Sequence, residues 1–238
     1  MNEIPRQLPL ALGFSERFGR EDFLPGPSNE AALALIERWP DWPAQVVALV
    51  GPEGAGKSHL AAIWAKASGA RLLASHAIVP GCVPTALATG ALVIEDLHQG
   101  ACEETALFHL LNLAREQDAF VLITAHTPPS GWSMRLRDLA SRLRALPAVT
   151  LAPPDDTLLR AVLVKLFADR QLKVDDDLIG YLMTRIERSF AAARAIVAEL
   201  DRVALRHRRE INRKFAAELL AGALRRNLPE PDPAARGC

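Results

Sequence analysis

Short apolar runs alternate with segments of helical periodicity along the first two thirds of the chain. The runs are rich in Val, Ile and Leu and are predicted to be buried strands at 46–50, 70–74, 91–96, 120–124 and 149–151. Between them, apolar residues return every three or four positions, as on one face of a helix, in 30–39, 59–68, 103–117 and 136–144. This alternation predicts an α/β domain with a parallel sheet flanked by helices.

The alternation stops at Pro153 and Pro154. Four helices are predicted beyond this point, at 156–170, 175–187, 190–208 and 212–226, and together they form a small all-helical lid domain. The expected organisation is a flexible N-terminal segment at 1–13, an α/β domain at 14–152, the lid at 153–226 and a disordered, proline-rich tail at 227–238.

The composition is that of a soluble globular protein. Half of the 238 residues are hydrophobic, and 28 basic side chains balance 28 acidic ones. No apolar run approaches the roughly 18 residues of a membrane span, and the N-terminus lacks the build of a signal peptide. Cys82, Cys102 and Cys238 show neither metal-ligand spacing nor an even disulfide framework. We therefore expect a cytoplasmic protein with reduced thiols and no membrane association.

The balanced charge also bears on nucleic-acid binding, which usually leaves a basic footprint. Four arginines gather near the end of the third lid helix: Arg202, Arg206, Arg208 and Arg209. A solvated charged face is the simpler interpretation of this group. Direct DNA binding is therefore expected to be weak or absent.

Residues 51–58 carry the clearest chemistry, because they fit the phosphate-binding pattern G-x-x-x-x-G-K-[ST] between a predicted strand and a predicted helix. Glycines at this place let the backbone approach a phosphate chain closely, and the helix N-terminus favours negative charge. Lys57 is expected to reach the β- and γ-phosphates and Ser58 to bind magnesium. The predicted nucleotide-binding residues of the loop are Gly51, Gly54, Ala55, Gly56, Lys57, Ser58 and His59, with ADP or ATP and Mg²⁺ as cofactors.

Acidic and polar residues end the next two central strands. Glu95 and Asp96 close the run 91–96, where Glu95 is assigned to the metal and Asp96 to orienting an attacking water. The alternative is that both begin a solvated loop. His126 follows the strand 120–124, where it either senses the γ-phosphate or is an ordinary loop residue.

The N-terminal segment carries Gln7, Leu8, Leu10 and Leu12 in the pattern Q-L-x-L-x-L. It resembles the peptides that bacterial replication proteins insert into the sliding clamp, the β subunit of the DNA polymerase. Such peptides place a glutamine at a polar subsite and apolar side chains in a hydrophobic pocket. The alternative is an arm that packs on its own domain.

The order of these features is similar to that of the AAA+ ATPases and, within them, of the DnaA replication-initiator family. The resemblance spans about residues 14–222 and is carried by the motifs at 23–29 (FLPGPSN), 56–60 (GKSHL), 128–129 (PP) and 139–142 (LASR). It implies a P-loop AAA+ domain followed by a helical lid. It also implies that Arg142 is an arginine finger that reaches the γ-phosphate of a neighbouring subunit, here DnaA carrying ATP. Arg188 would touch the bound nucleotide from the lid.

Each arginine has a plainer alternative. Arg142 lies among Arg135, Arg137 and Arg144 and would otherwise belong to a solvated basic face, and Arg188 would otherwise make a helix-end salt bridge. The family usually has Asp where Glu95 stands and an acidic or amide residue where His126 stands. Both departures imply weak ATP turnover by the chain alone.

Three functions remain in competition at this level. The first is a regulator that binds the sliding clamp, holds nucleotide and stimulates ATP hydrolysis by DnaA. The second is an autonomous ATPase that remodels DNA or loads another replication protein. The third is an adaptor that does not bind the clamp. The family resemblance also allows a homo-oligomer.

Overall fold

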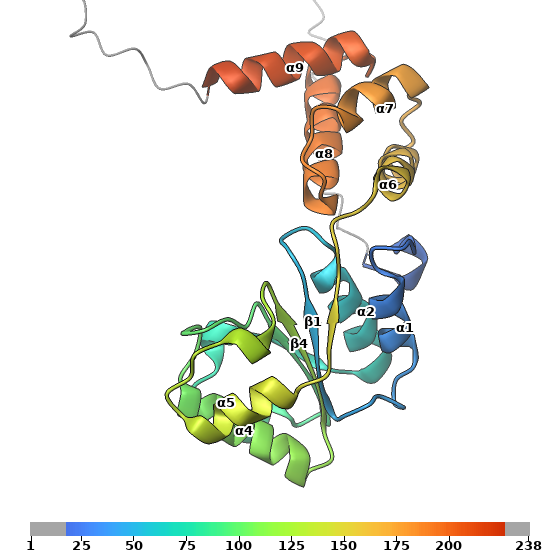
Figure 1. Ribbon diagram of the computed structural model, residues 1–238. Coiled ribbons are helices and arrows are strands. Elements are labelled where there is room, and N and C mark those ends of the chain that lie inside the picture. The colour runs from blue at the N-terminus through green and yellow to red at the C-terminus, as the bar shows by residue number, and fades with distance from the viewer. Residues whose placement is uncertain (1–17, 227–238) are drawn as a thin grey trace, which may run out of the picture.

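The computed structural model describes residues 18–226 (Figure 1). The predicted clamp-binding residues Gln7, Leu8, Leu10 and Leu12 and the predicted tail lie outside the described residues. Five strands form one parallel sheet in the order β2-β3-β4-β1-β5. The strands are β1 (Val46–Val50), β2 (Arg71–Ala74), β3 (Ala91–Glu95), β4 (Phe120–Ala125) and β5 (Ala148–Thr150).

Helices cover both faces of the sheet, as the near-continuous apolar sequence of its central strands requires. On one face α1 (Glu30–Glu37) and α2 (Lys57–Ser68) enclose a hydrophobic cluster with β1, β3 and β4. On the other face α3 (Val83–Ala86), α4 (Glu104–Glu116) and α5 (Arg137–Ala145) enclose a second cluster with the same strands. Single-turn 3-10 helices complete this part: η1 (Arg20–Asp22), η2 (Ser75–Ala77), η3 (Pro80–Cys82) and η4 (Pro129–Gly131).

The chain leaves the sheet after β5 and forms a group of four helices (Figure 1). They are α6 (Asp156–Asp169), α7 (Asp176–Met183), α8 (Phe190–His207) and α9 (Arg213–Arg226). Their apolar faces pack into a third hydrophobic cluster, which contains Leu163, Phe167, Val197 and Phe215. None of the buried residues in this cluster belongs to either sheet cluster.

The predicted fold class is confirmed, and the five strands and eight longer helices lie where the sequence pattern places them. The largest shift is in α7, which ends at Met183 because the following N–H groups turn back onto Tyr181 O and Leu182 O. The short elements between β2 and β3 were not predicted, since they are too brief to show a period. The division into domains at residue 152 stays a prediction.

Asn29 stands at the N-cap of α1, but its side chain does not cap the helix. Its Oδ1 accepts from Gly26 N at 2.9 Å, and its Nδ2 donates to Leu24 O at 3.0 Å. The buried amide thereby holds the preceding loop in shape. Within residues 18–226, no helix has the length and apolar character needed to cross a bilayer.

Candidate nucleotide-binding site

The predicted phosphate loop lies between β1 and α2, as its pattern requires. Gly54 has φ +72° and Gly56 has φ +101°, a left-handed region that side-chain-bearing residues rarely occupy. Gly56 is also the N-cap of α2, and no side chain caps the first-turn N–H groups. Those groups, together with the helix dipole, are available to an anion. Ala55 within the loop is buried.

Lys57 lies against the loop itself. Its ammonium donates to Gly51 O at 2.8 Å and to Pro52 O at 2.9 Å, and the residue is buried. Burial lowers the pKa of Lys57, while the negative charges of Asp96 and Glu53 act to raise it. A phosphate beside this ammonium would offer it charged acceptors in place of the two carbonyl oxygens.

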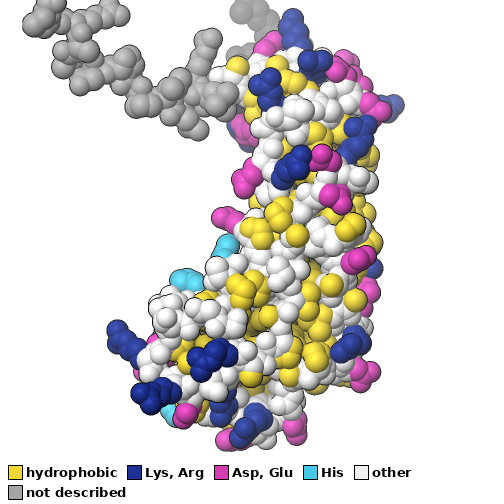
Figure 2. All heavy atoms as spheres, viewed as in Figure 1, with side chains coloured by type: hydrophobic (Ala, Val, Ile, Leu, Met, Phe, Trp, Pro, Cys, Tyr) yellow, Lys and Arg dark blue, Asp and Glu magenta, His cyan; other side chains and the backbone are white. Residues whose placement is uncertain are grey.

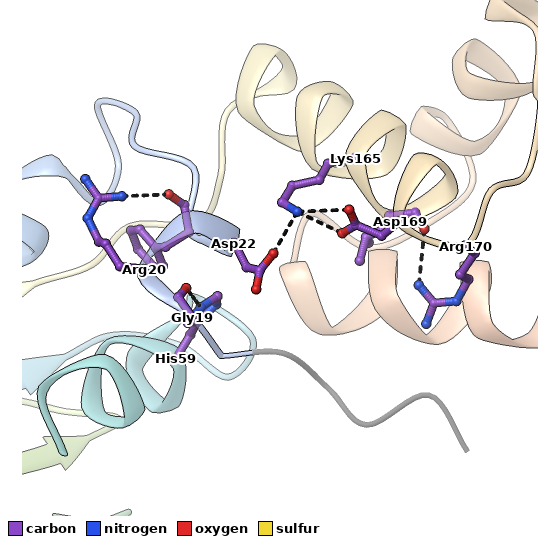
Figure 3. Close-up of polar contacts among 9 residues, drawn as sticks. Gly19, Arg20, Asp22, His59, Lys165, Asp169 and Arg170 are labelled. Atoms are coloured by element: carbon purple, nitrogen blue, oxygen red, sulfur yellow. Dashed lines mark hydrogen bonds and ion pairs between the residues drawn. The ribbon is translucent and has the colours of Figure 1, made fainter. Parts of the chain in front are cut away.

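Ser58 and His59 begin the same helix but face different surroundings. Ser58 is exposed. His59 contacts the chain around η1: its Nε2 lies 3.0 Å from Gly19 O (Figure 3). Its ring also makes edge contacts with Phe18 and Phe23, each with ring centres 5.2 Å apart. The structure therefore places His59 against residues 18–23, and a contact with nucleotide stays a prediction.

Glu95 and Asp96 lie at the carboxyl end of β3. The next strand in the sheet is β4, which in turn pairs with β1, the strand that leads into the phosphate loop. Glu95 is half-buried, and burial, followed by the nearby charge of Asp96, raises the pKa of its carboxyl group. Asp96 is exposed, and its Oδ1 lies 3.7 Å from His126 Nε2 at the end of β4. The structure thus brings Asp96 and His126 together at one edge of the sheet, and their roles towards a nucleotide stay predictions.

These residues fit a magnesium nucleotide only in part. Residues 18–226 contain no group of three or more His, Cys, Asp and Glu side chains that would hold a metal by themselves. Ser58 and Glu95 would therefore share a magnesium ion with the phosphate oxygens, as is usual for this ion. Such an ion would supply charge neutralisation at the phosphates.

The C-terminal helices reach the phosphate loop through the start of α8. Phe190 N donates to Gly54 O at 2.9 Å, and a Cβ atom at Gly54 would lie 2.8 Å from the Cβ of Ser189. Ser189 also caps α8 by accepting from Ala192 N. Glycine is required at position 54 for this close approach as well as for its φ angle.

Arg188 precedes this contact but points elsewhere. Its guanidinium lies 3.0 Å from Asp156 Oδ1 at the start of α6, and both side chains are exposed. This is the helix-end ion pair that the sequence offers as the alternative. A contact between Arg188 and nucleotide stays a prediction.

Arg142 lies on α5, on the face of the sheet opposite α2. Its Cζ is 5.0 Å from the centre of the Phe108 ring on α4, which is a cation–π contact, and the residue as a whole is partly exposed. Helices α4 and α5 lie at the end of the molecule farthest from the C-terminal helices (Figure 1). Lys and Arg side chains gather on this end in the same view (Figure 2). The structure does not bring Arg142 to the chain's own phosphate loop.

One charged junction was not predicted from the sequence. Lys165 on α6 donates to Asp22 Oδ1 at 2.8 Å and also to Asp169 Oδ2, so that a cation bridges η1 and the C-terminal helices (Figure 3). The Asp22 side chain is only 15% exposed. Because Asp22 and Lys165 are 143 positions apart, no local sequence pattern predicts this ion pair.

We expect Asp22→Asn to lower the free energy of unfolding by about 1.5–3 kcal/mol at pH 7, the typical contribution of a charged hydrogen bond. The hydrogen bond from Lys165 is the largest factor that lowers the pKa of Asp22. A lowered carboxyl pKa stabilises the fold above the unfolded-state value and loses this effect as pH falls through the folded-state value. Urea unfolding at several pH values should therefore show the two proteins converging below pH 3.8. A constant difference down to pH 2 would contradict this assignment.

The chain matches no family model. Among curated proteins it is similar to the chromosomal replication initiator protein DnaA of Caulobacter vibrioides, with 31% identity over 180 residues. The match covers 65% of this chain and 37% of the relative. The chain therefore spans about a third of the length of the curated relatives that it matches.

Solved structures agree in fold. Domain III of the replication initiation protein DnaA from Thermotoga maritima superposes with a TM-score of 0.71 at 19% identity, covering 86% of this chain and 96% of that chain. The RuvB Holliday junction branch migration motor of Thermotoga maritima gives 0.66 at 19% identity, covering 85% and 70%. AMPPCP-bound DnaA from Aquifex aeolicus gives 0.61 at 16% identity, covering 76% and 64%.

A five-stranded parallel sheet with a phosphate loop after β1 and a helical C-terminal part is the fold of an AAA+ protein. Within that class of fold, the chain is similar in sequence to DnaA over 180 residues and similar in structure to domain III of DnaA.

Proposed function

We propose that this chain is a nucleotide-bound regulator of bacterial chromosome replication initiation. In this role it binds the sliding clamp through Gln7, Leu8, Leu10 and Leu12 and stimulates ATP hydrolysis by DnaA through Arg142. The role is that of Hda, the clamp-bound protein that inactivates DnaA. The observation that carries the proposal is the separation of two features on one AAA+ fold: an intact phosphate loop, and an arginine on α5 that does not serve that loop.

Nucleotide has a structural role in this proposal. ADP or ATP binds between the phosphate loop and the start of α8, where Phe190 N already reaches Gly54 O. A ligand at this place favours one position of the C-terminal helices and thereby one shape of the partner-binding surface. Glu95 and His126 stand where the family usually has other residues, which supports weak hydrolysis by the chain alone.

Equilibrium binding to the purified sliding clamp tests the proposal. The double variant Gln7→Ala, Leu12→Ala should bind roughly 30-fold or more weakly than the wild type, because it removes both the polar and the apolar anchor of the peptide. Arg6→Ala is the matched control and should bind as the wild type does. Surface plasmon resonance with immobilised clamp gives the dissociation constants.

The outcomes separate the competing functions. Equal binding by the double variant and the wild type would place the clamp contact outside the motif. Absence of binding by either protein would refute the clamp-bound regulator. ATP turnover without DnaA, abolished by Lys57→Ala, would then favour an autonomous remodeller or loader, and its absence would favour an adaptor.

A further inference from the structure

Asp96 has an unusual backbone for its place in the fold. Its φ is +51°, in the left-handed region, and it directly follows strand β3. The other described non-glycine residues with positive φ are Asp118, Gln171 and Arg208, and each follows the end of a helix. A left-handed residue is common at a helix end and costs free energy elsewhere. Asp96 therefore needs a local cause.

Thr124 accepts hydrogen bonds from the backbone on both sides of the Asp96 Cα, and these bonds can hold Asp96 in the left-handed conformation. Asp96 N donates to Thr124 Oγ1 at 3.0 Å, and the next amide, Leu97 N, donates to Thr124 O at 2.8 Å. Asp96 O in turn accepts from Ser75 Oγ at 3.0 Å and from His98 Nδ1 at 2.9 Å. Both peptide groups beside the Asp96 Cα are thus fixed by side-chain partners.

The strand register explains why a side chain is needed there. The pairing of β3 with β4 ends at Ile94 and Ile123, so Asp96 lies past the last paired residues of β3. On its other side, β4 pairs with β1, where Thr124 faces Leu49 just before the phosphate loop. Thr124 therefore lies between the strand that leads into the loop and the strand that leads to the acidic pair.

Packing alone does not account for the hydroxyl group of Thr124. Its residue is fully buried, and it is the sole polar member of the β4 sequence Phe-Val-Leu-Ile-Thr-Ala. Valine has nearly the same shape and would avoid burying a hydroxyl. Thr124 Oγ1 accepts a hydrogen bond from Asp96 N. The hydroxyl is thus explained by its hold on Asp96.

The left-handed conformation of Asp96 changes the direction of its carboxylate relative to that of Glu95. In a continuing strand, successive side chains point to opposite faces. The left-handed turn at Asp96 interrupts this alternation, and its side chain is 65% exposed beside His126 while Glu95 stays half-buried. The turn therefore gives the two carboxylates different surroundings.

We propose that Thr124 is a positioning residue for the nucleotide site: its hydroxyl holds the Asp96 backbone in the left-handed conformation that directs the carboxylate towards the attacking water. The inference rests on the proposed nucleotide site. Thr124 itself touches no substrate in this scheme. It acts through Asp96. In the hydrolysis step the water oxygen would bond to the γ-phosphorus, the bond from that phosphorus to the bridging oxygen of ADP would break, and the water proton would pass to solvent or to the carboxylate, giving ADP and phosphate.

The test compares Thr124→Val with Thr124→Ser in the full chain. Single-turnover hydrolysis of radiolabelled ATP, with protein in excess, measures the rate even when turnover is slow, and titration calorimetry measures ATP binding. We expect Thr124→Val to reduce the hydrolysis rate roughly 10–100-fold with ATP affinity unchanged within about twofold, because a misplaced group loses rate and not binding. Thr124→Ser retains the hydroxyl and should restore the rate.

Two further measurements separate positioning from general loss of structure. Amide exchange at Asp96 should accelerate in Thr124→Val and not in Thr124→Ser. Thr89→Val is the matched control, because it removes a hydroxyl that donates to Ala91 O at the other end of β3. It should leave the hydrolysis rate unchanged.

Each result decides the inference. A Thr124→Val protein that hydrolyses ATP at the wild-type rate would overturn it, as would a wild-type protein that binds ATP and never cleaves it. A wild-type protein that binds neither ADP nor ATP would refute the proposed nucleotide site, and the inference would fall with it. Loss of rate in Thr124→Val with rescue in Thr124→Ser would support it.

Discussion

Arg142→Ala is expected to reduce the stimulation of DnaA's ATP hydrolysis roughly 10³-fold or more, because an arginine that stabilises phosphoryl transfer in trans typically contributes a factor of this size. The guanidinium stays charged and offers several donors to phosphate oxygens. Phosphate release from DnaA carrying ATP, measured with and without clamp on DNA, gives the stimulated rate. ADP binding by the variant should equal that of the wild type.

The surroundings of Arg142 provide matched controls. Arg144 lies two positions further along α5 and is exposed, so it points from a different side of the helix. Arg144→Ala should leave the stimulation intact if Arg142 acts specifically, and an equal loss in both variants would indicate a general basic surface. Arg142→Lys keeps the positive charge without the guanidinium. Full stimulation by Arg142→Ala would refute the finger.

Lys57→Ala is expected to weaken ADP and ATP binding roughly 10–100-fold, the effect of losing a charged hydrogen bond to phosphate. The ammonium is already held within the loop by Gly51 O and Pro52 O, so the side chain loses little further conformational entropy when nucleotide binds. Titration calorimetry with Mg²⁺ present measures the change.

A control is needed because Lys57 also contributes to the loop's own hydrogen bonding. Lys66, in the last turn of the same helix, is exposed, and Lys66→Ala should bind nucleotide as the wild type does. Thermal unfolding of apo Lys57→Ala shows whether the loop is destabilised. Nucleotide binding of wild-type strength in a stable Lys57→Ala protein would contradict the assigned role.

The fold was predictable because its signals are local. Apolar runs of four to six residues define the central strands, and helical periodicity defines α4, α6 and α8. The phosphate loop is also predictable from the sequence, since its glycines and lysine lie within eight residues between a strand and a helix. Elements of three or four residues, such as η2 and α3, carry too few positions to show a period.

The site was predictable only where neighbours in space are also neighbours in sequence or lie at strand ends. Asp96 and His126 were each singled out at a strand end, and they lie together because parallel strands share a carboxyl end. The bond from Phe190 N to Gly54 O and the pair of Asp22 with Lys165 join distant segments and have no sequence signal. Thr124 did carry a signal, as the sole polar residue of its strand.

The separate hydrophobic core of the C-terminal helices has a mechanical consequence. Because α6 to α9 bury their apolar faces among themselves, they can turn against the sheet as a rigid body without exposing that core. Such a turn would disturb polar links, such as Phe190 to Gly54 and Lys165 to Asp22. A nucleotide that adds a few contacts between the sheet and the C-terminal helices would therefore favour one orientation of these helices over the others.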